Sequence, residues 1–515
     1  MQLEEKLEQD FFSCLQQNVT EIESILGSPS DLVKRDFTIV EQVNLDASLL
    51  YIDGLADSDV IENTILRPLL TNEMNESITA LSSEQIKQVL TKKGLQVPSI
   101  SIVANFNDGI DAILAGNALL FVDQYKQAFS LSVQGWETRG IEEPQSDTVL
   151  RGPRDGFVES IRTNTALVRR RIRDPRFRIQ SMQIGKRSKT DIAITYIEGL
   201  VREDLVDEVL QRLNNIEIDA VLESNYIEEL IDDSPTSPFL TVQGTERPDK
   251  IAAGMYEGKV AIFVDNTPFV LIVPTHFWTF FQTSDDYYTH YTTASYFRFI
   301  RYIAFIISLT LPSFFVMLVS FHQEMIPTQL ALTIAAGREI VPLPVLIEAL
   351  LMETAFELMR EAGIRMPKPI GQAVSIVGSL VVGQAAVDAG IVSPIMVIVV
   401  ATTGIASFAI PDYLASVSIR LIRFPILIAS GFLGLLGFAT TFVLLVIHAI
   451  SLRSFGEPYM APYFPFNSRD RQDTMIRKPF WAIETRPADV KGNEQRAGKN
   501  QKPSPNKRRK TRYKR

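Results

Sequence analysis

The stretch Phe297–Phe321 reads FRFIRYIAFIISLTLPSFFVMLVSF and decides the fold class of the second half of the chain. Its apolar part, residues 302–321, has about the length that crosses a ~30 Å hydrocarbon core. Three more apolar runs follow, at 373–389, 391–410 and 424–450. Four such runs within one third of a chain are hard to bury in a soluble protein. We therefore predict an all-α polytopic membrane domain over residues 286–455.

The number of crossings follows from run length and from the basic flanks. The fourth run, at 27 residues, is too short for two spans and long for one, so we predict one tilted helix. Arg298 and Arg301 precede the first span and a basic tail follows the last, so both termini belong in the cytosol and the number of spans is even. Four spans satisfy this. Arg420 and Arg423, on a loop that this model places outside, count against it.

Charge and the start of the chain agree with a cytosolic N-terminus. Residues 469–515 carry 16 Lys or Arg and 5 Asp or Glu, a balance of +11, whereas the whole chain has a net charge of −9, so the rest carries −20. The start, MQLEEKLEQDFF, is acidic and amphipathic, and this pattern is not that of a signal peptide. We predict an amphipathic helix in residues 1–36 and a basic, disordered tail over 456–515. The single cysteine, Cys14, excludes an intramolecular disulfide.

Between the first two apolar runs lies a charged stretch, residues 337–365, with five glutamates and three arginines. Pro342 and Pro344 allow a helix to start near Val345. On that helix Glu353, Glu357 and Glu361 share one face. The first interpretation is a non-spanning or re-entrant element over 327–365 whose acidic face lines a cation path.

The residues that would form this path are Glu353 and Glu357, with Glu348 and Arg338 as weaker candidates. The second interpretation is an amphipathic helix that lies in the interface plane with its glutamates in water. The sequence leaves both open.

Small residues recur on two of the apolar runs and are typical of close helix packing; they are Gly378, Ser379, Gly383, Gly431, Gly434 and Gly437. The four histidines show no ligand spacing, so we expect no metal site and no cofactor. The sequence contains no P-loop, nucleophile elbow or zinc motif, which argues against an enzyme.

The first half of the chain contains a duplication. LLYIDGLADSDVIENTIL, residues 49–66, resembles ITYIEGLVREDLVDEVL, residues 194–210, and Tyr51 and Tyr196 are 145 positions apart. GNALLFVDQYKQAFSLSV, residues 116–133, resembles GKVAIFVDNTPFVLIV, residues 258–273, with Phe121 and Phe263 142 positions apart. We predict an α/β soluble N-terminal region of two related lobes, 37–150 and 178–285.

Each lobe is expected to begin with a hairpin, to continue into a helix and to end with a second hairpin. In the first lobe Asp57 or Ser58 is the expected N-cap of the helix. The apolar runs 119–122 and 261–264 are expected to be buried strands. Two such lobes either bind a ligand between them or form a rigid scaffold.

A basic helix is expected to connect the lobes within residues 151–177, from about Asp155 to Arg173. Its arginines are Arg162, Arg169, Arg170, Arg171 and Arg173. Nucleic acid is an unsuitable partner, because the surrounding domain is acidic and no aromatic residues interleave. Anionic lipid headgroups or an acidic face of a partner suit the helix better. A solvated face with intramolecular salt bridges is the alternative.

With these segments in view, the chain resembles the A subunit of the Ger-type (GerA family) bacterial spore germinant receptors, from about Phe37 to Phe466. The motifs that carry the resemblance are RGPRDGFVESIRTNTALVRRRIRDPRF, YIEGL, SPFLTVQGTERPDKIAAGMYEGKVAIFVDNTPFVLIVPT, HQEMIPTQLALTIAAGRE, REAGIRMPKPIGQAVSIVGSLVVGQAAVDAGIVSP, ASFAIPDY and SFGEPYMAPYFPF. The first 36 residues and the basic tail carry no such motif.

The resemblance implies a subunit of a three-part complex in the inner membrane of a dormant spore. Its partners would be a polytopic B subunit, similar to amino-acid transporters, and a lipoprotein C subunit. The complex senses small nutrients and triggers ion release, and the A subunit is expected to form a homo-oligomer that conducts ions. The alternatives are a scaffold that couples a sensor to another channel, and a secondary transporter, which too few spans and the lack of an inverted repeat disfavour.

Overall fold

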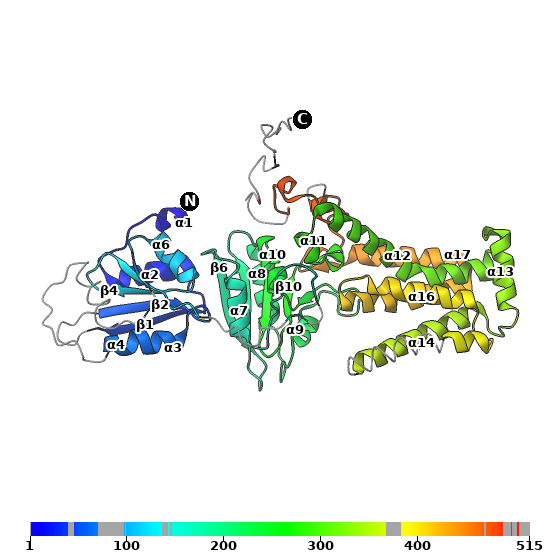
Figure 1. Cartoon of the computed structure of the whole chain (residues 1–515), viewed down its shortest axis with the longest axis horizontal. Helices are drawn as coiled ribbons and strands as arrows, with labels where there is room; N and C mark the ends of the chain where they lie inside the picture. The colour runs from blue at the N-terminus through cyan, green and yellow to red at the C-terminus, as the bar shows by residue number, and fades with distance from the viewer. Residues whose placement is uncertain are drawn as a thin grey trace, which may run out of the picture. The chain divides into compact units, whose positions relative to one another are not determined.

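The computed structural model describes residues 2–39, 46–70, 97, 99–135, 143–144, 147–366, 383–467, 470–487, 496 and 502–503. The chain divides into two compact units, here called the sheet unit and the helical unit. The sheet unit comprises Met1–Asp232, Val242–Pro274 and Glu484–Lys499, and the helical unit comprises Asp233–Thr241, Thr275–Ile483 and Asn500–Arg515. Figure 1 labels most of the helices and several of the strands of both.

Lobe 1 of the sheet unit is a five-stranded antiparallel sheet in the order β1-β2-β4-β5-β3. Its strands are β1 (Leu32–Thr38), β2 (Asp46–Ile52), β3 (Ile100–Val103), β4 (Ala118–Val122) and β5 (Ala128–Leu131). Its helices are α1 (Gln2–Leu7), α2 (Leu15–Leu26), α3 (Ser58–Val60), the π-helix η1 (Ile61–Leu66), α4 (Arg67–Leu70) and α6 (Phe106–Leu114). Asp57 caps α3, since its carboxylate accepts from Asp59 N at 2.9 Å, which confirms that prediction.

Lobe 2 repeats this sheet in the order β6-β7-β9-β10-β8. Its strands are β6 (Phe177–Ile184), β7 (Thr190–Ile197), β8 (Gln243–Thr245), β9 (Val260–Val264) and β10 (Val270–Val273). Its helices are α7 (Ile161–Arg169), α8 (Glu203–Asn214), α9 (Ser224–Ile231) and α10 (Pro248–Tyr256). Every residue of β4 and β9 is buried, as the apolar runs predicted.

The two sheets agree in register as well as in order. Leu49 pairs with Leu120 in lobe 1, and Ile194 pairs with Ile262 in lobe 2, positions 145 and 142 residues later. Tyr51 is the last residue but one of β2, and Tyr196 holds the same place in β7. The prediction of two related α/β lobes is therefore confirmed.

The duplication also includes a helix that precedes each sheet. Asn18 of α2 is buried, and its side chain exchanges two hydrogen bonds of 2.7 Å with the backbone of Phe12. Asn164 of α7 makes the same pair of bonds with the backbone of Val158, at 2.8 and 2.6 Å. Helix α7 is thus the first helix of lobe 2 and the counterpart of α2.

These contacts correct two expectations about the lobe boundaries. Residues 1–36 do not form a separate helix, because α2 buries Val19, Ile22 and Ile25 in one core with Leu50 of β2. The burial of each such side chain stabilises the lobe by about 1.5–3 kcal/mol. The basic helix is shorter than the predicted 155–173. It begins at Ile161, after the extended N-cap Ser160 and a hydrogen bond from Phe157 N to Glu246 O at 2.8 Å, and it ends at Arg169.

The helical unit contains α11 (Asp285–Tyr288), α12 (Tyr291–Phe321), α13 (Thr328–Arg338), α14 (Val345–Arg365), a helical segment at 383–388, α16 (Pro394–Phe408) and α17 (Tyr413–Ser451). Short 3-10 turns η2 (Phe277–Phe281), η3 (Gln323–Met325), η4 (Asp470–Asp473) and η5 (Phe480–Ala482) and the ribbon β11 (Arg453–Ser454) with β12 (Glu457–Pro458) complete it. Among the described residues, α12 and α17 are long and apolar enough to cross a membrane, and α16 is a shorter apolar helix.

Helix α17 is two helices rather than one. Gly434 has φ 58° and ψ −135°, a conformation outside the helical region that glycine adopts without strain. A Cβ on Gly437 would lie 2.0 Å from the carbonyl oxygen of Ala429, eight positions earlier, although eight residues span about 12 Å along a helix axis. The chain therefore folds back at Gly434, and the prediction of one tilted helix over 424–450 is wrong.

Contacts with α12 give the direction of the two halves. Arg423, in the first half, reaches Ser308, and Gly434 lies against Phe321 at the end of α12. In the second half Phe438 packs on Phe314, with ring centroids 6.2 Å apart. The half before Gly434 runs parallel to α12 and the half after it runs antiparallel.

Two apolar clusters mark the ends of this bundle. The near end, where α12 starts, gathers Phe277, Tyr302, Ala415, Leu452 and Tyr459. The far end gathers Phe315, Val319, Ile334, Val345 and Val392. Helix α12 runs from the near to the far end, α14 and α16 run back, and α17 runs out and back.

The first part of the predicted disordered tail is folded. Tyr459 and Arg477 are 1 % and 2 % exposed. The Arg477 Nη1 donates to Asp286 O at 2.6 Å, and Arg298 Nη1 donates to Asp473 at 2.8 Å. Residues 456–483 thus belong to the helical unit, because buried arginines and aspartates join them to the start of α12.

Candidate functional site: a buried charge ladder

Helix α14 carries most of the charged stretch, and it begins at Val345 directly after Pro344, as the two prolines predicted. Its 21 residues form an uninterrupted helix, about 31 Å long at 1.5 Å per residue. Four of its charged side chains bond to residues outside the helix, and the outward-facing Glu361 pairs with Arg365 of the same helix at 2.5 Å.

Glu353 lies in the middle of α14 and is fully buried. It forms an ion pair with Arg423 of α17, which is 1 % exposed and which also donates to Ser308 Oγ of α12 at 3.2 Å. A charge without a partner at this depth would cost several kcal/mol. The pair therefore joins α14, α17 and α12 at one point.

Glu357, one turn further along α14, lies 3.4 Å from Arg420 of α17. The Arg420 side chain is 7 % exposed and the Glu357 side chain is 29 % exposed. Since α14 and the first half of α17 run in opposite directions, the spacing 353, 357 on one helix faces 423, 420 on the other. We call these two ion pairs the charge ladder.

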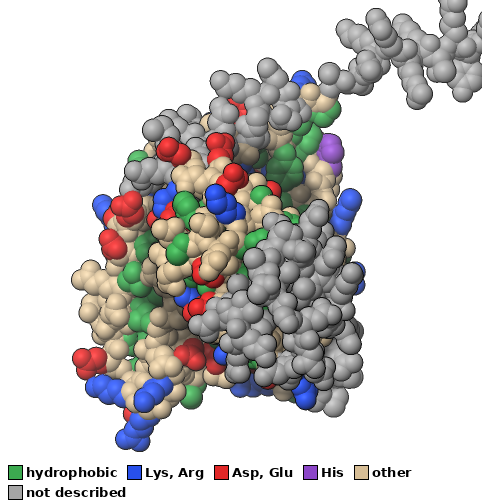
Figure 2. Space-filling view, turned by 90° about the vertical axis from the view of Figure 1, so that its left-hand side faces the viewer, with side chains coloured by type: hydrophobic (Ala, Val, Ile, Leu, Met, Phe, Trp, Pro, Cys, Tyr) green, Lys and Arg blue, Asp and Glu red, His purple; other side chains and the backbone are tan. Residues whose placement is uncertain are grey.

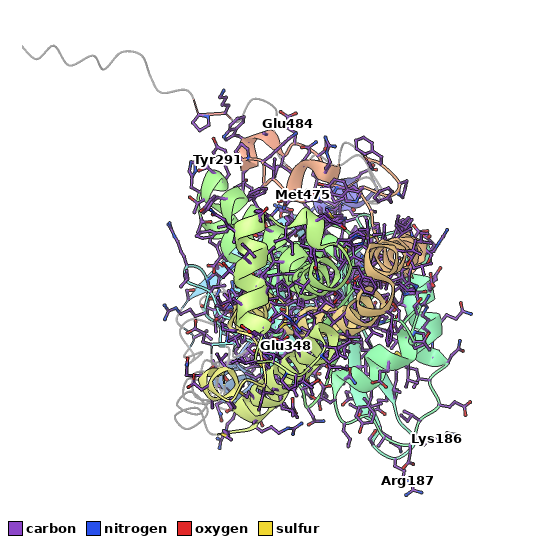
Figure 3. The ribbon with its side chains drawn as sticks, turned by 90° about the vertical axis from the view of Figure 1, so that its right-hand side faces the viewer. Lys186, Arg187, Tyr291, Glu348, Met475 and Glu484 are labelled. Atoms are coloured by element: carbon purple, nitrogen blue, oxygen red, sulfur yellow. The ribbon has the colours of Figure 1, made fainter. Side chains whose placement is uncertain are left out.

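Two further contacts join α14 to α16. At the far end Glu348 is fully buried and accepts hydrogen bonds from Ser393 N at 2.6 Å and Ser393 Oγ at 2.5 Å, beside an ion pair with Arg338 of α13 at 2.5 Å (Figure 3). Ser393 is the N-cap of α16, where a negative charge is favourable. Glu348 thus fixes the far end of α14 to the start of α16.

At the near end Arg360 makes the corresponding contact. Its Nη2 donates to Ser407 Oγ of α16 at 2.7 Å, and its guanidinium lies 4.1 Å from the ring centroid of Phe408. Helices α14 and α16 are therefore fastened to each other at both ends. The charge ladder is what fastens this pair to α17.

The ladder keeps unused hydrogen-bonding capacity. Among the described residues, the second carboxylate oxygen of Glu353 and that of Glu357 are buried and accept no hydrogen bond. The Nε atoms of Arg420 and Arg423 are likewise buried without an acceptor. A buried polar atom without a partner raises the free energy of the folded state, so the ladder is not the tightest possible packing of these helices.

All four candidate ion-path residues, Glu353, Glu357, Glu348 and Arg338, therefore form ion pairs inside the helical unit. Their partners Arg423 and Arg420 were assigned by the sequence analysis to a loop, but α17 begins at Tyr413 and includes both. Glu353 and Glu357 are four positions apart, and Arg420 and Arg423 are three apart, so each pair lies on one face of its helix. This spacing is a signal in the sequence that could have suggested the pairing.

The small residues lie where helices approach closely. A Cβ on Gly431 would lie 2.6 Å from the Leu346 side chain, and one on Gly383 would lie 3.6 Å from Val397. At Gly404 of α16, which the sequence analysis missed, a Cβ would lie 2.4 Å from the ring of Phe356. Gly378, Ser379 and most of the run 373–389 lie outside the described residues.

The five arginines of the predicted basic helix lie in the sheet unit, Arg162 and Arg169 within α7 and the other three directly after it. Arg162 pairs with Asp53 at 2.5 Å, and Arg169 donates to both oxygens of Asp31, at 2.6 and 2.8 Å. Both aspartates belong to lobe 1, so these bonds join the two lobes. Arg171 pairs with Asp155 at 2.5 Å. Arg170 and Arg173 line a cavity at the lobe junction, which is considered below.

Two duplicated α/β lobes, followed in one chain by an apolar helical unit with a buried charge ladder, define the class of protein. The chain belongs to the family described as Bacillus/Clostridium GerA spore germination protein, whose model matches residues 20–489. This confirms the family to which the motifs pointed. It also places the chain among spore germination proteins of the A-subunit type.

Individual proteins with similar sequences support this family membership. The chain is 46 % identical over 492 residues to spore germination protein KA of Bacillus subtilis (strain 168), with 95 % of this chain and 89 % of that protein covered. It is 40 % identical to the membrane protein YfkQ of the same organism, covering 98 % and 96 %, and 39 % identical to spore germination protein GerLA of Bacillus cereus, covering 91 % and 94 %.

A solved structure is also similar. It is the N-terminal domain of the A subunit of the Bacillus megaterium spore germinant receptor GerK3, 36 % identical to this chain with a TM-score of 0.42. The match covers 52 % of this chain and 98 % of that structure.

Proposed function

We propose that the chain is the A subunit of a nutrient germinant receptor in the inner spore membrane and has no enzymatic role. It works with a polytopic B subunit and a lipoprotein C subunit, and it converts nutrient binding into the ion release that starts germination. Several copies form a cation channel. The observation that carries this mechanism is the charge ladder between α14 and α17, because carboxylates at membrane depth mark ion routes.

The direction of each membrane crossing follows from the packing of the helix bundle. Helices α12, α14, α16 and the two halves of α17 each run between the near and far ends, so five crossings lie within the described residues, where the sequence analysis expected four in all. The start of α12 and the end of α17 both lie at the near end, which brings both flanks of the helical unit, and with them both termini, to one side. That side is the cytosol, since Arg298 and Arg301 flank the first crossing there.

In the resting state the arginines neutralise the glutamates, so the route is closed to cations. Opening separates α14 from α17 and exposes Glu353 and Glu357 to water. In a closed ring of identical subunits each glutamate would recur around the axis, and acidic rings favour cations. The opposite face of α14 supports such a ring, since Ile347, Leu351 and Leu358 are 45 %, 42 % and 67 % exposed in the single chain.

The test is cation flux through the purified full-length protein in liposomes, with and without the partner subunits. Removal of one charge of a buried pair costs about 3–5 kcal/mol, so the informative variant is E353Q/R423Q, which removes both charges together. We expect it to assemble and to conduct cations without nutrient, because the latch between α14 and α17 is lost. E361Q, on the exposed pair with Arg365, is the matched control and should behave as wild type.

Selectivity separates the channel from the scaffold. E357Q should lower the preference for cations over anions while the protein still assembles. If no copy of the chain conducts ions in any combination of subunits, and if E353Q/R423Q releases ions from spores at the normal nutrient-dependent rate, the chain is a scaffold or relay to another channel.

Topology has its own test. Reporter fusions at Met1 and at Arg515 should both give a cytoplasmic signal, and a fusion within α13 should give an external one. An external signal at either terminus would contradict this arrangement.

A further inference from the structure

A comparison of the two lobes shows whether the fold itself requires the arginines of the basic helix. Helix α7 is the counterpart of α2, and Asn164 corresponds to Asn18, 146 positions earlier. By that offset the five arginines in and directly after α7 correspond, in order, to Gln16, Glu23, Ser24, Ile25 and Gly27. Lobe 1 folds with none of these charges. The arginines of lobe 2 are therefore not a requirement of the fold and need another explanation.

Two of the five are explained by the lobe junction, since Arg162 and Arg169 bond to Asp53 and Asp31. The other three, Arg170, Arg171 and Arg173, line a cavity of about 270 Å³ together with Asp155. Its opposite wall comes from lobe 1 and consists of Leu55, Leu114 and Ala115. One side of this cavity is therefore strongly basic and the other is apolar.

Among the described residues that line this cavity, three guanidinium groups stand beside the one carboxylate of Asp155. Burial lowers the pKa of Arg170 below its ordinary value, the neighbouring Arg171 and Arg173 lower it further, and Asp155 acts in the opposite sense. Three like charges this close repel one another, so an anion among them would stabilise the sheet unit.

A neighbouring cavity of about 440 Å³ has a different character. Arg162 and Arg170 line it, but so do Asp57 and Asp59, and the charges balance. Acidic and basic side chains are also interspersed over the face of the chain that Figure 2 presents. A preference for anions therefore belongs to the smaller cavity.

We propose that the cavity at Arg170, Arg171 and Arg173 binds a small anion, a carboxylate or phosphate whose apolar part lies against Leu55 and Leu114. Guanidinium groups bind both oxyanions through paired N–H donors, which suits three arginines at one helix end. Because the basic wall belongs to lobe 2 and the apolar wall to lobe 1, a bound anion bridges the lobes. The oxyanion belongs either to a free small molecule or to a lipid headgroup.

Equilibrium dialysis of the purified full-length protein in a neutral detergent tests this, with radiolabelled inorganic phosphate and radiolabelled hexanoate as probes. Wild type should bind both, hexanoate more tightly, and more weakly as salt is raised. R170Q/R173Q should bind each probe at least tenfold more weakly. Arg171 is left unchanged because it pairs with Asp155.

R187Q is the matched control, since Arg187 is 84 % exposed and projects at the tip of the β6–β7 hairpin (Figure 3). It should bind as wild type. Hydrogen exchange at α7 shows whether R170Q/R173Q stays folded, and R173Q alone replaces it if not, since Arg173 is an exposed residue.

Displacement of the probe by dihexanoyl phosphatidylglycerol, but not by dihexanoyl phosphatidylcholine, identifies a lipid headgroup as the source. Failure of both lipids to displace it identifies a free small anion. Absence of binding to wild type by either probe, or equal binding to R170Q/R173Q and wild type, overturns the proposal.

Discussion

Lobe 1 and lobe 2 have one fold and very different surfaces. Both contain a buried asparagine that hydrogen-bonds to the segment before the first helix. In both, an aspartate that follows the third strand in the spatial order accepts a hydrogen bond from the N–H of the first helical residue. Asp123 accepts from Leu15 at 3.2 Å, and Asp265 accepts from Ile161 at 3.0 Å. Phe11 packs on Phe121 as Phe157 packs on Phe263. What differs lies at the lobe junction, where Arg162 and Arg169 of lobe 2 bond to aspartates of lobe 1.

The difference teaches which residues the fold requires and which serve another purpose. Features that survive in both copies hold the lobe together, and features found in one copy serve the junction or a ligand. Four changes test this division, all measured on the full-length protein by hydrogen exchange with mass spectrometry, which reports local free energies of opening.

The largest effect is expected at Arg169, which is 1 % exposed and is absent from lobe 1. R169Q leaves the half of the junction around Asp31 without its charge partner, and we expect α7 to lose about 3–5 kcal/mol of protection. The matched variant E23Q, at the counterpart position in α2, should change protection little. Equal losses in the two variants would mean that position 169 serves lobe 2 itself and not the junction.

The shared asparagines come next. N18A and N164A each remove two part-buried hydrogen bonds and leave a backbone N–H and C=O unsatisfied, so each should cost about 2–4 kcal/mol. The two losses should agree, since the geometry is the same in both lobes. A clear difference between them would break the equivalence of α2 and α7.

Smaller effects are expected at the aspartates that cap the helices. D123N and D265N keep an oxygen acceptor but remove the charge at the helix N-terminus, which should cost about 0.3–1 kcal/mol in each lobe. Raising the salt concentration should shrink both losses. Losses that are insensitive to salt would point to packing in place of charge.

The smallest effect depends on pH and concerns Glu223, which caps α9 of lobe 2. Burial would raise the pKa of this carboxyl, but hydrogen bonds from Ser224, Asn225 and Thr267 outweigh burial and hold the pKa below 4.5. A lowered folded-state pKa stabilises the protein above the unfolded-state pKa, and this contribution is lost as pH falls through the folded-state pKa. Protection of α9 should therefore fall on acidification below about pH 4.5 in wild type and less in E223Q. Parallel profiles for the two proteins would contradict this.

Much of the sheet unit could be predicted because its signals are local. The repeats around Tyr51 and Tyr196 and around Phe121 and Phe263 predicted two lobes, and alternation of apolar runs with turns predicted their strands. Asp57 was a recognisable N-cap. The equivalence of α2 and α7 was not visible, because only the asparagine and the apolar positions are shared, and a helix tolerates almost any residue on its exposed face.

The sequence by itself determined the family, the two lobes, the apolar helices and the charged helix that starts at Val345. Tertiary structure decided the rest, for physical reasons that no local pattern contains. A run of 27 apolar residues is compatible with one helix or two. The close approach of Gly437 to Ala429 shows that the chain reverses direction at Gly434. The same holds for the glutamates of α14, whose partners Arg420 and Arg423 lie more than 60 residues further along the chain. A buried charge must find a counter-charge, but which one it finds depends on how the helices pack.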